Sequence, residues 1–175
     1  LGMAEALFLL GEYDEAYREI EKARGYTSDS RNLKLLEGRI LTALAKYDAA
    51  KEIYLRLLSQ LPHDSDANRG LAEIYAIIGQ KELADQAYDK SLLYSPGDRR
   101  VLLQLVILHD AAREKKQADV IVQEVLRLFP DNLSVRIQAA EHYSLYDEWE
   151  MAMEHLERAA SMLATSNDLR YPKVS

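Results

Sequence analysis

Residues 65–98 read SDANRGLAEIYAIIGQKELADQAYDKSLLYSPGD, and this stretch decides the fold. Its first half carries apolar side chains at helical spacing: Leu71, Ile74, Tyr75 and Ile78. A second helical pattern runs over residues 82–95, after a break at Gly79. Because glycine readily takes the left-handed conformation that a tight turn often needs, Gly79-Gln80-Lys81 is predicted to join two antiparallel helices. The stretch therefore predicts a helical hairpin.

The same pattern returns along the chain at one constant period, which is the length of the quoted stretch. One slot holds alanine in all five of its occurrences: Ala16, Ala50, Ala84, Ala118 and Ala152. A large apolar slot reads Ile20, Tyr54, Tyr88, Val122 and Leu156. Small residues at fixed places let two antiparallel helices approach closely, and the larger residues fill the space beside them. Since chance poorly explains several slots in phase, the sequence predicts a tandem array of helical hairpins.

Three of the four prolines keep the same spacing and precede polar residues. The segments are Pro62-His63-Asp64-Ser65, Pro96-Gly97-Asp98 and Pro130-Asp131-Asn132. Proline cannot continue a helix, and Asp, Ser or Asn caps the next one. No segment alternates convincingly with the period of a strand, so the expected fold class is all-α.

This pattern resembles the tetratricopeptide repeat, a helix–turn–helix unit with the same period. Its marks are clearest at Leu71-Ala72, Tyr75, Gly79, Ala84, Tyr88 and Pro96. The resemblance implies an all-α, right-handed superhelical solenoid of about five antiparallel hairpins. It predicts one array over residues 1–166, followed by a C-terminal tail at 167–175. The repeats would span 1–30 (truncated), 31–64, 65–98, 99–132 and 133–166.

Some positions depart from the pattern of the family. The first repeat lacks the opening residues of its first helix, so we expect the chain to be a fragment of a longer protein. Lys34 and Arg136 stand where the family often has a large apolar residue, and Glu37 replaces the usual leucine. The repeats that contain them are predicted to pack less regularly, or to meet something unusual.

Composition narrows the functional classes. The 175-residue chain has a net charge of −7, which opposes non-specific binding to nucleic acid or to anionic lipid. It contains no cysteine, so disulfides, thiolate catalysis and cysteine-based zinc sites are excluded. No apolar run is long enough to span a membrane, and the acidic start is not a signal peptide. We expect a soluble protein without a cofactor, and its compartment, cytoplasmic or periplasmic, stays open.

The resemblance also implies a binding face, formed mainly by the first helix of each hairpin, that takes extended or helical peptides. By repeat phase, the residues expected in this groove include Arg39, Arg69, Glu73, Arg100, Gln104, Gln138 and Glu141. Arginine offers a planar fork of donors that suits carboxylates, so the three arginines could form a site that reads anions. They could instead pair with Glu73 or nearby acids and form a solvated face. The Lys, Asn and Arg set with which some members clamp the C-terminal carboxylate of a chaperone is not reproduced, and that function is rejected.

No chemistry-bearing motif competes with this interpretation. The sequence has no nucleophile elbow, glycine-rich phosphate loop or HExxH motif, so we do not expect an enzyme. The spacing of His142 and His155 matches no standard helical pair of metal ligands, and satisfied histidines are expected there. The leading hypothesis is an adaptor that holds a peptide or protein segment in the groove. The alternatives are a scaffold that self-assembles through its open repeat ends, and a docking module of a larger protein.

Overall fold

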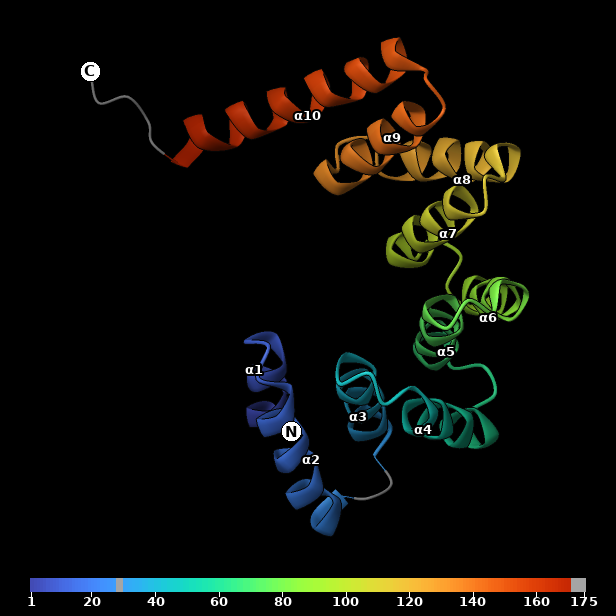
Figure 1. Cartoon of the computed structure of the whole chain (residues 1–175). Helices are drawn as coiled ribbons and strands as arrows, with labels where there is room; N and C mark the ends of the chain where they lie inside the picture. Colours follow the sequence, from blue (N-terminus) through green and yellow to red (C-terminus); the bar gives the residue numbers. More distant parts are fainter. Residues whose placement is uncertain (28–29, 171–175) are drawn as a thin grey trace. The chain divides into compact units, whose positions relative to one another are not determined.

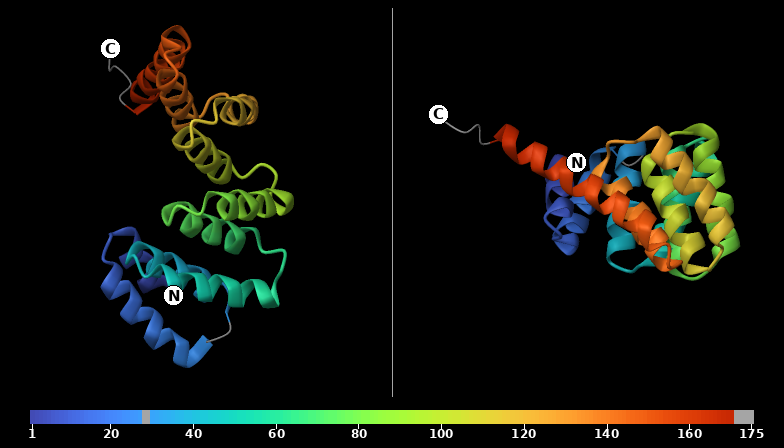
Figure 2. Two further views of the ribbon diagram at one scale, coloured as in Figure 1. Left: turned by 45° about the vertical axis from the view of Figure 1, so that its right-hand side comes forward. Right: turned by 90° about the horizontal axis from the view of Figure 1, so that it is seen from above.

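The computed structural model describes the backbone of residues 1–27 and 30–170, and the side chains of residues 1–25 and 30–164. These parts contain helices and turns and no strand, and consecutive helices pair as antiparallel hairpins (Figures 1 and 2). The helices are α1 (Gly2–Leu9), α2 (Tyr13–Thr27), α3 (Arg31–Ala43), α4 (Tyr47–Gln60), α5 (Ser65–Ile77), α6 (Lys81–Tyr94), α7 (Arg99–Ala111), α8 (Lys115–Leu128), α9 (Leu133–Leu145) and α10 (Trp149–Arg170). The predicted all-α helical repeat solenoid is confirmed; its right-handed superhelical sense stays a prediction.

The helix starts follow the period of the sequence. Helices α3, α5, α7 and α9 begin one period apart, at Arg31, Ser65, Arg99 and Leu133. The second helices of the hairpins keep the same spacing, at Tyr13, Tyr47, Lys81, Lys115 and Trp149. Each period of the sequence is therefore one hairpin of the structure.

A left-handed residue closes the turn inside every hairpin. The positive φ angles fall at one slot of the repeat, which holds Gly11, Ala45, Gly79, Arg113 and Asp147. Gly11 and Gly79 take this conformation without steric cost, as was predicted for the turn at Gly79. The other three residues carry a Cβ, and each costs about 1–2 kcal/mol there. The left-handed conformation is thus common to all five turns, and glycine is the residue that adopts it with the least strain.

Polar caps start the helices that follow the prolines. Asp64 accepts a hydrogen bond from the backbone N–H of Ala67 at 2.9 Å, and Asp98 accepts one from Arg100 at 2.9 Å. Asn132 caps α9 in the same way, from Val135 at 3.2 Å. The predicted caps are therefore confirmed at all three positions.

Proline sets where the second helices end. Helices α4, α6 and α8 end at Gln60, Tyr94 and Leu128, each two residues before a proline. Ala164 occupies that slot in the last hairpin, and α10 continues to Arg170. Helical structure thus extends into the tail predicted at 167–175, because nothing at residue 164 stops it. Residues 171–175 lie outside the described part.

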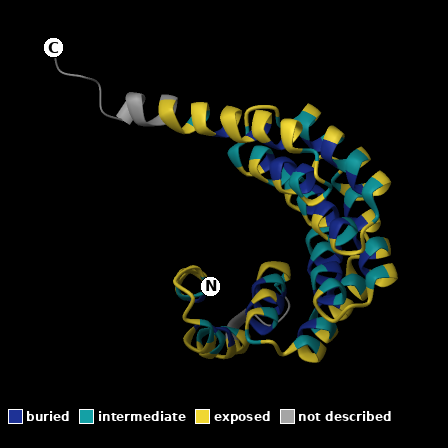
Figure 3. Ribbon diagram, turned by 45° about the horizontal axis from the view of Figure 1, so that its top comes forward, coloured by how far each residue is buried: buried dark blue, intermediate teal, exposed yellow. Residues whose placement is uncertain are grey.

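The alanine slot is buried in all five hairpins, and so are the large residues Ile20, Tyr54, Tyr88 and Val122 of the neighbouring slot. In Figure 3 the buried residues follow the faces along which helices of one unit meet. Tyr54 packs in one core cluster with residues of α3, α4 and α5, and Ile20 in another with residues of α1, α2 and α3. Each first helix in these clusters therefore covers the hairpin before it.

The helices form two compact units. One comprises Leu1–Pro96 with α1 to α6, and the other comprises Gly97–Ser175 with α7 to α10. The boundary falls between the third and fourth predicted repeats. The single array over 1–166 stays a prediction, and the sites below are described within one unit or the other.

Candidate functional site

In the first unit, Arg69 of α5 lies between two carboxylates. Its Nη1 donates to Glu73 Oε1 at 2.8 Å, and its Nη2 donates to Asp66 Oδ1 at 3.1 Å. Only 11% of the Arg69 side chain is exposed. Because two acids on the same helix already neutralise this guanidinium, its contacts are those of a paired face and not of an open anion site.

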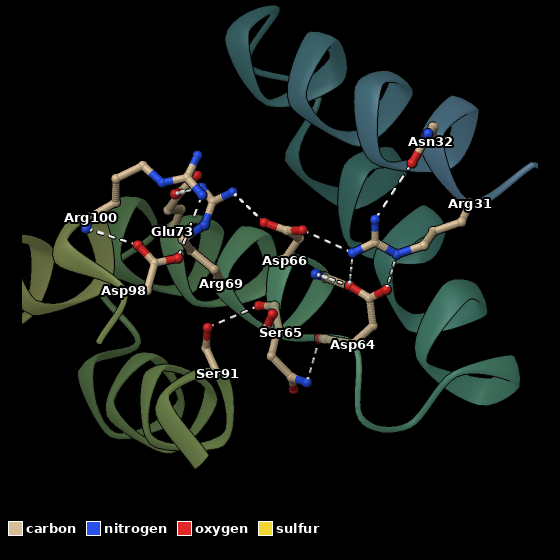
Figure 4. A network of polar contacts seen from close by, with 12 residues as sticks. Arg31, Asn32, Asp64, Ser65, Asp66, Arg69, Glu73, Ser91, Asp98 and Arg100 are labelled. Atoms are coloured by element: carbon tan, nitrogen blue, oxygen red, sulfur yellow. Dashed lines mark hydrogen bonds and ion pairs between the residues drawn. The ribbon is translucent and has the colours of Figure 1, made fainter. Parts of the chain in front are cut away.

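Asp66 joins Arg69 to a second arginine, as Figure 4 shows. Arg31 of α3 donates to Asp66 Oδ2 at 2.9 Å and also holds the capping residue Asp64. Partial burial alone would raise the pKa of Asp66, but the hydrogen bonds from Arg31 and Arg69 lower it below its ordinary value. The network thus ties α3 to the first turn of α5.

Arg39 of α3 has a different environment. Its guanidinium carbon lies 4.5 Å from the centre of the Phe8 ring on α1, and its side chain is exposed. A guanidinium over an aromatic face is a cation–π contact. Arg39 was predicted to line the groove, and the structure places it against the Phe8 ring.

Tyr54 lies behind these residues, between α3 and α5. Burial, reinforced by the charge of Glu73, raises the pKa of Tyr54 far above its ordinary value, so its phenol stays neutral. Side-chain carbons at Gly38 or Gly70 would lie 2.9 and 2.7 Å from its hydroxyl oxygen. The two glycines therefore leave the room that the ring fills, and the ring supports α3 and α5 from behind.

In the second unit, the first helices α7 and α9 enclose an open cavity of about 520 Å³. Two predicted groove residues, Gln138 and Glu141, contribute to its lining. The full lining is Ile107, Asp110, Ala111, Arg113, Gln138, Glu141 and Leu145. Exposed apolar side chains, Ile107 and Leu145, thus stand beside an amide and a carboxylate.

The other predicted residues of this unit lie on α7. Arg100 contacts Asp98, the cap of its own helix, at 3.5 Å. Gln104 is exposed one turn before Ile107, which lines the cavity. Within the described part of the chain, the side-chain amides of Gln104 and Gln138 make no hydrogen bond to the protein. These amides are consequently available to a ligand.

Sequence reasoning found the helices of this face but not all of its contacts. Asp66 was missed as a partner of Arg69, although its spacing of three residues on one helix is a usable signal. Arg31 was also missed, because its contact with Asp66 joins residues that are 35 apart. The role of the seven predicted groove residues in binding stays a prediction.

His142 and His155 belong to the packing of the second unit. His142 is fully buried, with Nδ1 2.8 Å from Asp110 Oδ1 and Nε2 2.8 Å from Asp119 Oδ1. It thus links α9 to α7 and α8. His155 is buried as well, and its Nδ1 accepts a hydrogen bond from Arg136 at 3.0 Å. Among the described residues, no group of three or more His, Cys, Asp or Glu side chains could hold a metal ion.

The polar departures from the repeat pattern are also satisfied inside the fold. Lys34 donates to Gln60 at 2.6 Å, and buried Glu37 pairs with Arg24 of α2. Arg136 also donates to the carbonyl oxygen of Pro130 at 2.8 Å. These positions exchange apolar packing for ion pairs and hydrogen bonds. No described helix is both long and apolar enough to cross a membrane.

No protein-family profile matches the sequence, and no curated protein is significantly similar to it. Solved structures are similar over most of the chain. A tetratricopeptide repeat protein of Thermus thermophilus, TTC0263, has a TM-score of 0.81 at 21% identity, covering 97% of this chain and 93% of its own. MamA residues 41 to the end from Desulfovibrio magneticus RS-1 gives 0.74 at 17% identity, covering 94% and 93%.

A third structure, the Cut9–Hcn1 hetero-tetramer of the APC/C, gives a TM-score of 0.78 at 18% identity. That match covers 92% of this chain and 31% of the matched chain. At such identities the likeness concerns the arrangement of the helices.

Proposed function

We propose that this chain, which has the tetratricopeptide repeat fold, is a protein-binding scaffold. It holds a peptide or protein segment along the first helices of its hairpins. The residues proposed to contact the segment are Arg39, Arg69, Glu73, Arg100, Gln104, Gln138 and Glu141. The proposal assigns the chain no catalytic role, because its sequence carries none of the catalytic motifs sought.

One observation carries the proposal: the cavity of α7 and α9 combines the free side-chain amide of Gln138 with the exposed apolar side chains of Ile107 and Leu145. The side-chain amide of Gln138 has the donors and acceptor of a peptide group, so it can bond the backbone of an extended segment. Ile107 and Leu145 can at the same time cover an apolar side chain of that segment. A ligand that has peptide groups and spaced apolar side chains fits this lining.

Arg39 supports the same class of ligand in the first unit. Phe8 holds its guanidinium by stacking, while its donors remain exposed toward solvent. A preoriented arginine can take a carboxylate or a backbone carbonyl of a bound segment. Arg69 contributes differently, because its ion pairs with Asp66 and Glu73 position Glu73 as an acceptor on this face.

The test begins with selection of binders from a random peptide library on the 175-residue chain. The selected peptide is then titrated against a variant that carries Gln104→Ala and Gln138→Ala. Removal of two amides should weaken binding by about tenfold or more, at about 1 kcal/mol for each hydrogen bond. The substitutions remove no side-chain hydrogen bond within the described part of the chain, so the melting temperature should change little.

A matched control carries Gln117→Ala and Gln123→Ala, two exposed glutamines of the second helix α8. The control should bind like the parent. Equal loss in both variants, or an unchanged affinity in the groove variant, would contradict the assignment of the ligand to the first helices. Failure to select any peptide would contradict peptide binding itself.

A further inference from the structure

The last hairpin carries an apolar hollow on its open side. A cavity of about 360 Å³ between α9 and α10 is lined by Ile137, Ala140, Glu141, Ser144, Trp149, Ala152, Met153 and Leu156. Large apolar side chains in it are exposed, with 58% of Trp149 and 46% of Leu156 open to solvent. We call this surface the α9–α10 seat. Such a contiguous apolar surface is typical of an interaction site.

The repeat shows what this position packs against when it is covered. Leu156 lies three periods after Tyr54, of which only 1% is exposed. Tyr54 is covered by α5, through Gly70 and the apolar residues Leu71 and Ile74. Ile20, one period earlier, is covered in the same way by α3. The seat therefore has the lining that takes the first helix of a following hairpin.

Helix α1 has side chains like those with which a first helix covers the preceding hairpin. Two periods separate Gly2, Met3 and Ala6 from the residues Gly70, Leu71 and Ile74 that cover Tyr54. All three residues of α1 are exposed, Met3 at 65%, and Leu10 extends the apolar strip at 73%. Gly2 repeats the small residue that lets α5 approach a large side chain of the preceding hairpin.

We propose that α1 of a second copy of this chain packs into the α9–α10 seat, head to tail. Both surfaces belong to one sequence, both are exposed, and their residues correspond in repeat phase to helices that pack together within the first unit. The contact joins two different surfaces, so copies add head to tail until the array closes into a ring or continues as an open chain. The seat shares Glu141 with the groove of the proposed function, but the variants below leave Glu141 unchanged, and the proposal does not depend on that function.

The test is sedimentation of the 175-residue chain from low to high micromolar concentration. The parent should show a series of masses that starts at the monomer, 20.0 kDa, and grows with concentration. A seat variant carries Met153→Glu and Leu156→Glu, and a head variant carries Met3→Glu and Leu10→Glu. Each should remain monomeric at concentrations where the parent assembles. A matched control with Leu93→Glu and Val120→Glu, exposed on α6 and α8, should assemble like the parent.

Mixing the two variants gives a sharper result. The head variant keeps an intact seat and the seat variant keeps an intact α1, so the mixture should form a heterodimer and nothing larger. Because that result requires both variants to be folded, it also excludes loss of assembly by misfolding. A monomeric parent, assembly by either variant alone, or a mixture without heterodimer would overturn the proposal.

Discussion

The phenol ring of Tyr54 lies against Gly70, so closely that a side-chain carbon on Gly70 would stand 2.7 Å from the hydroxyl oxygen of Tyr54. The same ring leaves no room for a side chain at Gly38. The Tyr54 ring therefore packs between α3 and α5 and sets the spacing of these two helices, which carry Arg39, Arg69 and Glu73. Packing behind the proposed binding face sets the positions of residues on it.

Gly70→Ala should consequently destabilise the protein. The added methyl group must displace a buried aromatic ring, and overpacking of this kind costs about 1–3 kcal/mol. Urea unfolding measures the change in the free energy of unfolding. Gly25→Ala is the matched control, because a side chain there meets nothing within 4 Å in α2, and it should stabilise by about 0.5–1 kcal/mol. Equal effects at both glycines would show that the Tyr54 ring does not exclude a side chain at Gly70.

His142→Leu should be among the most damaging substitutions in the second unit. It removes the hydrogen-bond partner of buried Asp110, and one partner of the partly exposed Asp119, which keeps Lys115. A buried polar group that loses its hydrogen-bond partner costs about 1–3 kcal/mol. Thermal unfolding would show the loss. His63→Leu, at an exposed histidine, serves as the control and should change the melting temperature little. A small effect at His142 would show that Asp110 finds another partner.

His155 should make stability depend on pH near neutrality. Burial and the charge of Arg136 lower the pKa of His155 below its ordinary value of 6.5. Above that value the imidazole is neutral in both the folded and unfolded states, so it adds no pH dependence. As the pH falls through 6.5, the unfolded chain takes up the proton first, and the free energy of unfolding decreases.

Urea unfolding at pH 7.5 and pH 5.5 checks this sign. The parent should lose more stability between the two values than His155→Gln, which has no proton to gain. The other histidines are common to both proteins, so the difference belongs to residue 155. An equal loss in both would show that His155 is protonated in the folded state.

The hairpins could be predicted because their determinants are local and repeated. The spacing of Pro62, Pro96 and Pro130, and the polar caps behind them, place the ends of helices without knowledge of their neighbours. The alanine slot predicts the close contact of two helices in the same way. Local steric rules of this kind act identically in every repeat.

The contacts of the predicted groove could not be read in the same way. Their positions in the repeat placed Arg39 and Arg69 on equivalent helix faces, but their environments differ. Arg39 contacts the ring of Phe8, whereas Arg69 donates to Asp66. Likewise, His142 joins carboxylates 32 and 23 residues away, a distance at which no helical periodicity applies. Such pairs depend on the packing of different helices, and only the folded structure brings them together.

Ala164→Pro should shorten α10, because residue 164 occupies the slot in which proline ends α4, α6 and α8. Proline removes the hydrogen bond from residue 164 to the carbonyl of Ala160, and its ring clashes with that carbonyl. By analogy with Gln60, Tyr94 and Leu128, the helix should end at Met162. Backbone chemical shifts of residues 163–170 would then lose their helical values, whereas Ala164→Ser should retain them. Helical shifts that persist to Arg170 in the proline variant would show that contacts beyond the repeat pattern hold the end of α10.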